Sequence, residues 1–334
     1  MTIVSADRVQ ELAKAALLGQ GVAPELADEV VTEFVVAELA GQSSHGLGKL
    51  ASLQFGSLDA IPAFVEHAAV LAVNGLGANG LLVLRAVARR LIAPARHHGV
   101  ALASVRNFSR HAALYPYTEI LATQGLVGIL MNSAGPAAVA PFGSIDPITG
   151  TNPICFSFPT PSGPHTLDFS TAEVVWGEIR QATLEGRELP AGPFLDADGE
   201  ITLVPSEVNA VKAFGGAKGW ALNLAIDVLA GAMTGAPSGL AVQDEFDCGA
   251  LMIAIDPEAT GAGTTLPHAV AGLLDEVRQA RPGTGATSVR VPGDRRRGPG
   301  LPNEVDIPPA TLALLERLAS GERVLEFSSN PLLN

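Results

Sequence analysis

Residues 69–108 read AVLAVNGLGANGLLVLRAVARRLIAPARHHGVALASVRNF, and their pattern indicates the class of fold. The apolar run at 69–75 predicts a strand, and 80–99 has the three- and four-residue apolar spacing of a helix. Residues 100–108 form a second apolar run, which predicts another strand. A strand, a helix and a strand in succession favour an α/β domain.

Strands and helices continue to alternate along the chain. Helices are expected at 5–19, with Ser5 as the N-cap, from Pro24 onward, and at 118–125, 219–235, 266–280 and 308–319. Strands are expected at 126–134, 154–160, 165–170 and 251–257. The segment 219–235, GWALNLAIDVLAGAMTG, is almost wholly apolar, so we expect it to form a buried helix.

Composition narrows the class of protein. The chain has 334 residues, 47% of them hydrophobic, so it can bury a sizeable core. Its net charge of −13 argues against nucleic acid and anionic membranes as partners, although a small anionic substrate needs only a local cation. Cys155 and Cys248 predict no disulfide framework. The N-terminus lacks the pattern of a signal peptide and no apolar run is long enough for a membrane span, so a cytoplasmic protein is expected.

The hexapeptide GLGANG at 75–80 matches the dinucleotide-binding pattern GxGxxG between a predicted strand and a predicted helix. A Rossmann site also needs an acidic residue about 20 positions later, which binds the ribose. No Asp or Glu lies between Glu66 and Glu119, although Arg106 is placed where an NADP-type site uses arginine. Chance is the alternative, because the chain contains 36 glycines.

The stretch GQSSHGLGKL at 41–50 holds a second candidate site. In a helix, His45 and Lys49 are four residues apart and would share one face. An imidazole beside an ammonium suits a site that binds an anion and moves a proton. The alternative is that His45 is an ordinary residue at a helix end.

Six segments in the same order resemble the type 2 malate/L-lactate dehydrogenase family, which includes ureidoglycolate dehydrogenases, sulfolactate dehydrogenases and Δ1-piperideine-2-carboxylate reductases. They are SSHGLGK (43–49), APFGSIDPITGTNP (140–153), LDFSTAEVVWGEI (167–179), LDADGE (195–200), GGAKGWALNLAIDVLAGAMTG (215–235) and VRVPGD (289–294). The resemblance implies an α/β fold that binds NAD(P) without a Rossmann fingerprint, so GLGANG becomes a glycine-rich turn. It also implies a homodimer. We expect a helical N-terminal part at 1–68, a cofactor-binding core at 69–300, and a C-terminal helix at 301–334 that packs on the N-terminal part.

The resemblance also assigns candidate site residues. The catalytic candidates are Ser44, His45, Lys49 and His111, and the substrate-binding candidates are Lys49, Arg110 and Thr151. The cofactor-binding candidates are Ser133, Gly150, Thr151, Asn152, Asp168, Phe169, Ser170, Lys218, Gly219 and Gly293. Glycines around Lys218 and the turn at 150–153 suit close approach of the backbone to a ligand. No metal site is expected.

The sequence departs from the family pattern at three positions, two of which are candidate site residues. Lys49 stands where the family has an arginine that clamps the substrate carboxylate, and lysine lacks its bidentate fork. Arg110 stands where members similar to ureidoglycolate dehydrogenase have a catalytic histidine, with His111 next to it. Ala134 also replaces a small hydroxyl residue, for which Ser133 is the substitute.

The resemblance implies an NAD(P)H-dependent oxidoreductase that moves hydride to or from the α-carbon of a small 2-oxo or 2-hydroxy acid. A first alternative is a reductase of cyclic imino acids, because an iminium needs less help from an acid at position 110. A second is a family member that has lost catalysis and only binds a ligand. The choice between NADH and NADPH stays open.

Overall fold

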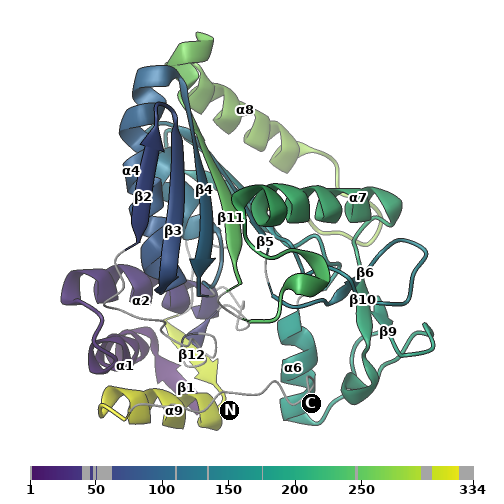
Figure 1. The fold of residues 1–334 in the computed structure, drawn as a ribbon. Helices are drawn as coiled ribbons and strands as arrows, with labels where there is room; N and C mark the ends of the chain where they lie inside the picture. Colours follow the sequence, from purple (N-terminus) through teal and green to yellow (C-terminus); the bar gives the residue numbers. More distant parts are fainter. Residues whose placement is uncertain are drawn as a thin grey trace. The chain divides into compact units, whose positions relative to one another are not determined.

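The computed structural model describes residues 2–39, 46–47, 50, 62–109, 111–133, 135–174, 176–244, 247–294 and 303–322. The chain divides into two compact units. The smaller unit comprises residues 1–59 and 295–334, and the larger comprises residues 60–294. Each unit is described separately below, with the labels of Figure 1.

The smaller unit joins the two ends of the chain. Helices α1 (Ala6–Gly19) and α2 (Pro24–Leu39) begin where predicted, and the Ser5 side chain caps α1 by accepting a hydrogen bond from the Arg8 amide. Strand β1 (Thr2–Ser5) pairs antiparallel with β12 (Glu304–Ile307). Helix α9 (Pro309–Ala319) packs closely on α1, since a Cβ at Gly19 would lie 2.6 Å from the Leu318 carbonyl oxygen.

The larger unit is built on a seven-stranded sheet of order β2-β3-β4-β11-β5-β7-β8. Strands β3 and β4 are parallel and joined by helix α4 (Gly80–His98), which confirms the strand–helix–strand prediction. Every other neighbouring pair is antiparallel. The strands are β2 (Ala63–His67), β3 (Val70–Ala78), β4 (Val100–Phe108), β5 (Val127–Ser133), β7 (Ile154–Phe158), β8 (His165–Phe169) and β11 (Gly249–Ile255).

Helices cover both faces of this sheet (Figure 1). Helices α4 and α5 (Tyr115–Thr123) lie on one face, where Thr118 of α5 contacts Cys155 and Ser157 of β7. Helix α7 (Ala217–Ile226) lies on the other face and continues as a π-helix, η3 (Asp227–Gly231), and a 3-10 turn, η4 (Ala232–Thr234). There Ile226 and Ala230 pack against Met131, Ile154 and Leu251. Both cysteines, Cys155 and Cys248, are buried.

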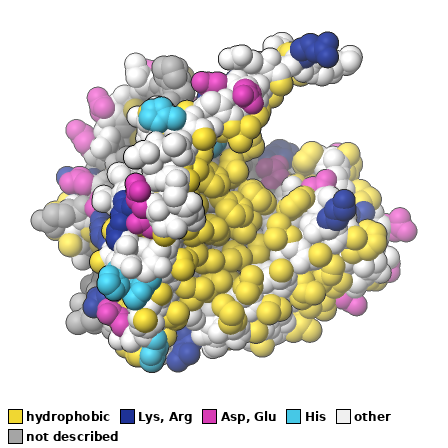
Figure 2. All heavy atoms as spheres, turned by 90° about the horizontal axis from the view of Figure 1, so that it is seen from above, with side chains coloured by type: hydrophobic (Ala, Val, Ile, Leu, Met, Phe, Trp, Pro, Cys, Tyr) yellow, Lys and Arg dark blue, Asp and Glu magenta, His cyan; other side chains and the backbone are white. Residues whose placement is uncertain are grey.

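The segment 219–235 is not a buried helix, which corrects the sequence prediction. Leu224, Val228 and Met233 are 46%, 51% and 51% exposed, because the segment packs on the sheet along one side only. Helix α8 (Leu266–Gln279) has no buried residue at all. Hydrophobic side chains gather in a broad, hollowed surface of the larger unit, seen from above in Figure 2. No helix in the described ranges is both long and apolar enough to cross a membrane.

Shorter elements complete the larger unit. A three-stranded sheet, not predicted from the sequence, joins β6 (Val139–Ala140), β10 (Ala210–Lys212) and β9 (Phe194–Leu195). The remaining helical elements are α6 (Trp176–Glu185), η2 (Pro205–Glu207), η5 (Gly239–Ala241) and η6 (Pro257–Thr260). Residues 196–199 form a turn in which the Asp196 carboxylate accepts from the amides of Asp198 and Glu200.

Candidate functional site

The sheet register brings most candidate residues to one edge of the larger unit. Ser133 at the end of β5 lies opposite Gly249, which in turn lies opposite Arg106 near the end of β4. On the other side of β5, Met131 pairs with Ile154 and Ile154 with Phe169. The segments that follow β4, β5 and β8 and precede β7 therefore all leave the sheet at this edge.

A buried polar network connects these segments to the α7 side of the sheet. The carboxylate of Asp227, a residue only 5% exposed, accepts hydrogen bonds from Ser133 Oγ (3.0 Å), Asn152 Nδ2 (3.1 Å) and the Gly239 amide (2.9 Å). One turn earlier, Asn223 is fully buried and accepts from Thr149 Oγ1 at 2.6 Å. The α7–η3 segment thus holds both the end of β5 and the loop at 149–153.

The loop at 149–153 is held by its carbonyl groups. Asn223 Nδ2 donates to the Gly150 carbonyl at 3.0 Å, and Thr171 Oγ1 donates at 2.9 Å to the carbonyls of Thr151 and Asn152. Asn152 has a positive φ of 36°, which is uncommon for a residue with a side chain. In the described part of the chain, the main-chain N–H groups of Gly150 and Thr151 donate to no protein acceptor. Their chemistry suits an anionic or carbonyl ligand.

Two of the predicted cofactor-binding residues therefore have side chains that form structural hydrogen bonds within the protein. The side chains of Ser133 and Asn152, which are 1% and 0% exposed, both donate to Asp227. Asp168 has a similar duty, because its Oδ2 accepts from the amides of Leu114 and Tyr115 at 2.9 and 3.0 Å, at the beginning of α5. Phe169 is exposed at this edge, and Thr151 and Ser170 are partly buried there.

The beginning of α7 lies beside the loop that follows β8. Phe214 donates its amide to the Thr171 carbonyl, and its ring packs edge-to-face against Phe169 with centroids 6.1 Å apart. The N-cap of α7 is Gly216, with φ of 63° and no side-chain hydrogen bond to the helix. Exposed Lys218 lies in the first turn. Amide groups at a helix N-terminus beside a lysine suit a phosphate group.

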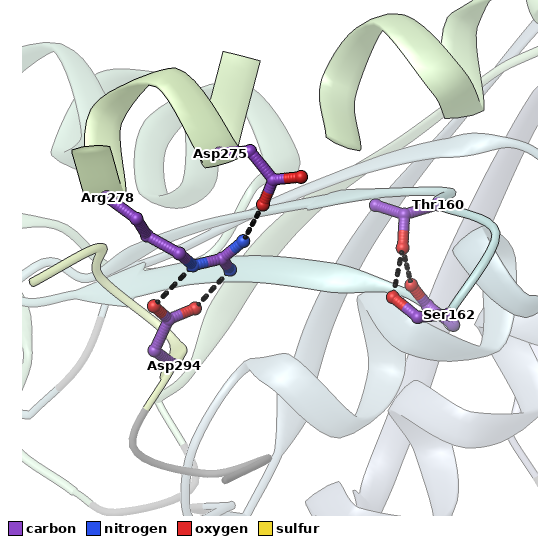
Figure 3. Close-up of polar contacts among 6 residues, drawn as sticks. Thr160, Ser162, Asp275, Arg278 and Asp294 are labelled. Carbon is purple, nitrogen blue, oxygen red and sulfur yellow. Dashed lines mark hydrogen bonds and ion pairs between the residues drawn. The ribbon is translucent and has the colours of Figure 1, made fainter. Parts of the chain in front are cut away.

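Glycines 219 and 293 are required for close packing of the backbone. A Cβ at Gly219 would lie 1.6 Å from the Phe214 carbonyl oxygen, and one at Gly293 would lie 2.3 Å from the Thr166 carbonyl oxygen. Next to Gly293, Asp294 forms a double hydrogen bond with Arg278 of α8, which also binds Asp275 (Figure 3). This Arg278 contact lowers the pKa of the Asp294 carboxyl group. Gly293 therefore has a structural role whether or not a cofactor lies near it.

His111 is held in an aromatic pocket after β4. It is 8% exposed, stacks on Phe108 with ring centroids 6.0 Å apart, and meets the edge of Tyr117 at 5.7 Å. Burial raises the pKa of the Tyr117 hydroxyl above its ordinary value, against the opposing effect of the nearby Arg85 guanidinium. Tyr117 is therefore a neutral phenol at physiological pH.

The GLGANG turn has a different construction from a phosphate-binding loop. Asn79 caps α4 by accepting from the Leu81 amide at 2.9 Å, and Ser109 Oγ accepts from the Gly80 amide at 3.1 Å. A Cβ at Gly75 would lie 2.5 Å from the Asn107 carbonyl oxygen. Gly75 serves close packing against β4, and protein side chains bind the Gly80 and Leu81 amides, which a phosphate would otherwise use.

Ser44, His45, Lys49, Arg110 and Ala134 lie outside the described residues. Their immediate neighbours are informative. The carboxylate of Glu38, a residue 6% exposed in the last turn of α2, accepts a hydrogen bond from the Leu47 amide at 2.8 Å. The Leu50 amide donates to the Gly46 carbonyl at 3.1 Å.

Asn223 and Asp227 were not predicted as site residues. They are polar residues four positions apart in an otherwise almost apolar segment, so they share one helix face. This spacing is the feature of the sequence that could have identified the two residues as a pair.

Comparisons with known proteins agree with this geometry. The malate/L-lactate dehydrogenase family matches residues 4–305. The chain is 34% identical to a Δ1-pyrroline-2-carboxylate/Δ1-piperideine-2-carboxylate reductase of Pseudomonas syringae pv. tomato, over 95% of this chain and 96% of that one. It is 32% identical to an L-sulfolactate dehydrogenase of Methanocaldococcus jannaschii, over 82% of this chain and 83% of that one.

Solved structures show the same fold. The crystal structure of a dehydrogenase from Sinorhizobium meliloti aligns with a TM-score of 0.83 and 31% identity, covering 95% of this chain and 98% of that one. That of Δ1-piperideine-2-carboxylate reductase from Pseudomonas syringae aligns with a TM-score of 0.78 and 32% identity, covering 95% of this chain and all of the other. The resemblance found in the sequence is therefore confirmed: this chain belongs to the malate/L-lactate dehydrogenase family, and it is an NAD(P)H-dependent oxidoreductase.

Proposed function

We propose that the protein reduces the C=N bond of a small cyclic imino acid. The observation that carries this proposal is the 34% identity, over 95% of the chain, to a reductase named for two such acids. The hydride adds to the carbon of the C=N bond beside the carboxylate; an iminium, which already carries one proton, becomes a neutral amine, and this amine takes up a second proton from solvent. A small 2-oxo acid is the second candidate substrate, supported by 32% identity to an L-sulfolactate dehydrogenase.

In this proposal the substrate carboxylate is neutralised by Lys49, with Arg110 and Thr151 as further contacts. His45 orients or protonates the reacting heteroatom, assisted by Ser44, and His111 is the rival acid. An iminium carries its proton before reduction, so the substitution of Arg110 for a histidine impairs imine reduction less than ketone reduction. The aromatic surroundings of His111 restrict its ring orientation.

The residues at the sheet edge fit a dinucleotide. Lys218, the first amides of α7, for which the N-cap Gly216 provides no side-chain acceptor, and the main-chain N–H groups of Gly150 and Thr151 offer donors for phosphate and carboxamide groups. Phe169, 40% exposed, offers an apolar surface, and Ser170 is nearby. When bound, NAD(P)H supplies the hydride. We therefore place cofactor binding in the core at 69–300, and the substrate motif in the helical part at 1–68, against which 301–334 packs.

A substrate panel tests the choice of reaction. Purified protein is assayed with Δ1-piperideine-2-carboxylate, Δ1-pyrroline-2-carboxylate, pyruvate and oxaloacetate, each with NADH and with NADPH, by the loss of absorbance of the reduced cofactor. We expect a higher kcat/KM for the imino acids. Turnover confined to the 2-oxo acids would establish the second candidate. Absence of turnover with all four, together with absence of cofactor binding, would favour the inactive family member.

Variants test the residue roles. Lys49→Met removes the charge but keeps the apolar stem, so kcat/KM should fall roughly ten- to a hundredfold, as expected for a lost charge-assisted hydrogen bond. Lys14→Met is the matched control, because Lys14 in α1 forms only a surface ion pair with Asp28. Whichever of His45→Ala and His111→Ala removes one limb of the pH profile of kcat/KM identifies the acid. Wild-type kcat/KM in Lys49→Met would contradict its role.

We also propose a cytoplasmic homodimer. Leu224, Val228 and Met233 form an exposed apolar stripe along α7 to η4, and Leu273 of α8 is 60% exposed. Contiguous apolar surface of this kind marks an interaction site (Figure 2). Light scattering at micromolar concentration should give twice the chain mass of 34.3 kDa. A monomer mass would contradict the proposal, and Val228→Glu should shift a dimer toward that mass.

A further inference from the structure

The buried carboxylate of Asp227 is an unusual feature of the α7–η3 segment. Its neighbours Ile226 and Ala230 pack against Met131 and Ile154 in an apolar cluster. An apolar side chain would suit such packing, and burial of a carboxylate is unfavourable unless hydrogen bonds compensate for its lost hydration. Asp227 receives those hydrogen bonds from Ser133, Asn152 and Gly239. We therefore attribute the carboxylate at this position to the hydrogen bonds that it accepts from these segments.

The position of Asp227 in the helix is also unusual. The regular α-helix ends at Ile226, and the π-helix begins at Asp227 and ends at Gly231. Single π-helical turns are rare in proteins overall, but those that do occur are often found at functional sites. The change of helix type occurs next to the polar network, one turn after Asn223.

The network controls the conformation of the loop at 149–153. Asn152 donates to both Asp227 and the Asn223 carbonyl, and Asn223 donates to the Gly150 carbonyl. Asn152 keeps a positive φ of 36°, a conformation that persists only where surrounding contacts hold it. With the carbonyls held by the protein, the N–H groups of Gly150 and Thr151 have no acceptor among the described residues, so they can donate to a ligand.

We propose that Asp227 and Asn223 are positioning residues that hold the loop at 149–153 in the conformation that binds the cofactor. This inference rests on the proposed placement of the cofactor at that loop. The two residues act through Ser133, Thr149, Gly150 and Asn152 and do not themselves touch the dinucleotide. Loss of Asp227 therefore weakens cofactor binding beyond what its effect on the fold explains.

The chain provides a matched control for this claim. Asp256 is also a buried carboxylate, 4% exposed, with hydrogen bonds to Arg96 (2.7 Å) and the Glu258 amide (3.1 Å). It follows the opposite end of β11, about 20 Å from Gly249 at the candidate edge. Replacing Asp256 perturbs a buried carboxylate of the same unit without touching the 149–153 loop.

A second pair of variants perturbs the network mildly. Thr149, 1% exposed, donates its hydroxyl to Asn223 Oδ1. Thr149→Val keeps the shape of the side chain and removes the donor, whereas Thr149→Ser keeps the donor. The pair therefore separates the hydrogen bond from packing, and it preserves the test where Asp227→Asn fails to fold.

The experiment compares wild-type protein with the variants Asp227→Asn, Asp256→Asn, Thr149→Val and Thr149→Ser. Each protein is titrated with NADH and with NADPH, and binding is followed by fluorescence. For each protein, kcat, the KM for cofactor, the KM for substrate and Tm are also measured. Asp227→Asn should raise the cofactor Kd about tenfold or more and the cofactor KM with it, as for a lost hydrogen bond to a charged group. The substrate KM should not change. Asp256→Asn should lower Tm and leave Kd within about twofold. Thr149→Val should raise Kd, and Thr149→Ser should restore it.

Three outcomes would overturn the positioning role alone: a wild-type Kd in Asp227→Asn, an equal rise in Asp256→Asn, or equal behaviour of the two Thr149 variants. Wild-type protein that binds neither dinucleotide would overturn the proposed cofactor site as well, so the two failures are distinguishable.

Discussion

Helices α4 and α7 of the larger unit both begin within a glycine-rich stretch, GLGANG (75–80) and GGAKG (215–219), yet their N-termini are built differently. At α4, Asn79 and Ser109 accept hydrogen bonds from the first amides. At α7, the N-cap Gly216 provides no side-chain acceptor, and Lys218 follows in the first turn. The first stretch matches a dinucleotide-binding pattern and has its first amides bound by side chains. The second matches no such pattern, and in the described part of the chain it has no side-chain cap and carries an exposed lysine.

The comparison shows why a glycine pattern alone is a weak guide to a nucleotide site. Glycines permit close backbone approach, but a phosphate needs amides that no side chain has already bound. Pattern matching detects the glycines and does not detect the cap. Variants at the two N-termini can therefore separate the glycine pattern from the donor supply.

The largest effect is expected for Gly219→Ala in the first turn of α7. The new Cβ would lie 1.6 Å from the carbonyl oxygen of Phe214, a backbone atom of a residue whose amide donates to the Thr171 carbonyl. We expect a loss of about 2 kcal/mol or more in the free energy of unfolding, measured by urea denaturation. Cofactor binding should fall below detection in a fluorescence titration. A stable variant with wild-type affinity would show that the start of α7 is remote from the cofactor.

A smaller effect, confined to binding, is expected for Lys218→Met. The side chain is exposed, so the free energy of unfolding should change by less than about 0.5 kcal/mol. Removing a cation from a phosphate contact should raise the cofactor Kd roughly tenfold. The difference from wild type should shrink as salt is added, because salt screens exposed charges. Lys212→Met, at an exposed lysine in β10, is the control, and an equal rise in its Kd would indicate a general charge effect.

At the N-terminus of α4, Asn79→Ala is expected to lower stability and to leave cofactor binding unchanged, which is the reverse of the result expected for Lys218→Met. Loss of the cap should cost about 1 kcal/mol in the free energy of unfolding, because the Leu81 amide loses its acceptor. Cofactor Kd should stay within about twofold of wild type. Asn79→Ser, which keeps a capping oxygen, should recover most of the stability. Weaker cofactor binding in Asn79→Ala would implicate the α4 N-terminus after all.

Much of the fold could be predicted from the local pattern of apolar and polar residues. Residues 100–108 were predicted as a strand and are β4, and Gly99 ends α4 with a φ of 81°, a conformation that favours glycine. Strands β1 and β12 were missed because each has four residues and its partner lies at the other end of the chain. The exposed side of α7 was missed because an apolar composition does not reveal which face of a helix the sheet covers.

Less of the candidate site could be predicted from the sequence. The resemblance identified the loops at 150–153 and 168–170, and the structure brings both to one edge of the sheet. It did not indicate that Ser133 and Asn152 donate to Asp227, since such contacts depend on packing between distant segments. The roles of His45, Lys49 and Arg110 stay predictions, as these residues lie outside the described part of the chain.

The smallest effect on binding is expected for Gly77→Ala, within the glycine pattern itself. A Cβ there meets no atom within 4 Å, so only the backbone conformation resists the change. Its φ of 74° lies in the left-handed region, where an alanine costs about 1 kcal/mol. Cofactor Kd should be unchanged within about twofold, measured by the same fluorescence titration.

Gly77→Asn refines this test, because asparagine tolerates the left-handed conformation better than alanine and is the bulkier of the two. A phosphate bound at GLGANG would be displaced more by asparagine, whereas backbone strain would be greater with alanine. We expect asparagine to recover stability and both variants to bind the cofactor as wild type does. A tenfold rise in Kd for Gly77→Asn, with the fold intact, would return the dinucleotide to the α4 N-terminus. The amides of Gly80 and Leu81, which donate to Ser109 and Asn79, would then have to rearrange on binding.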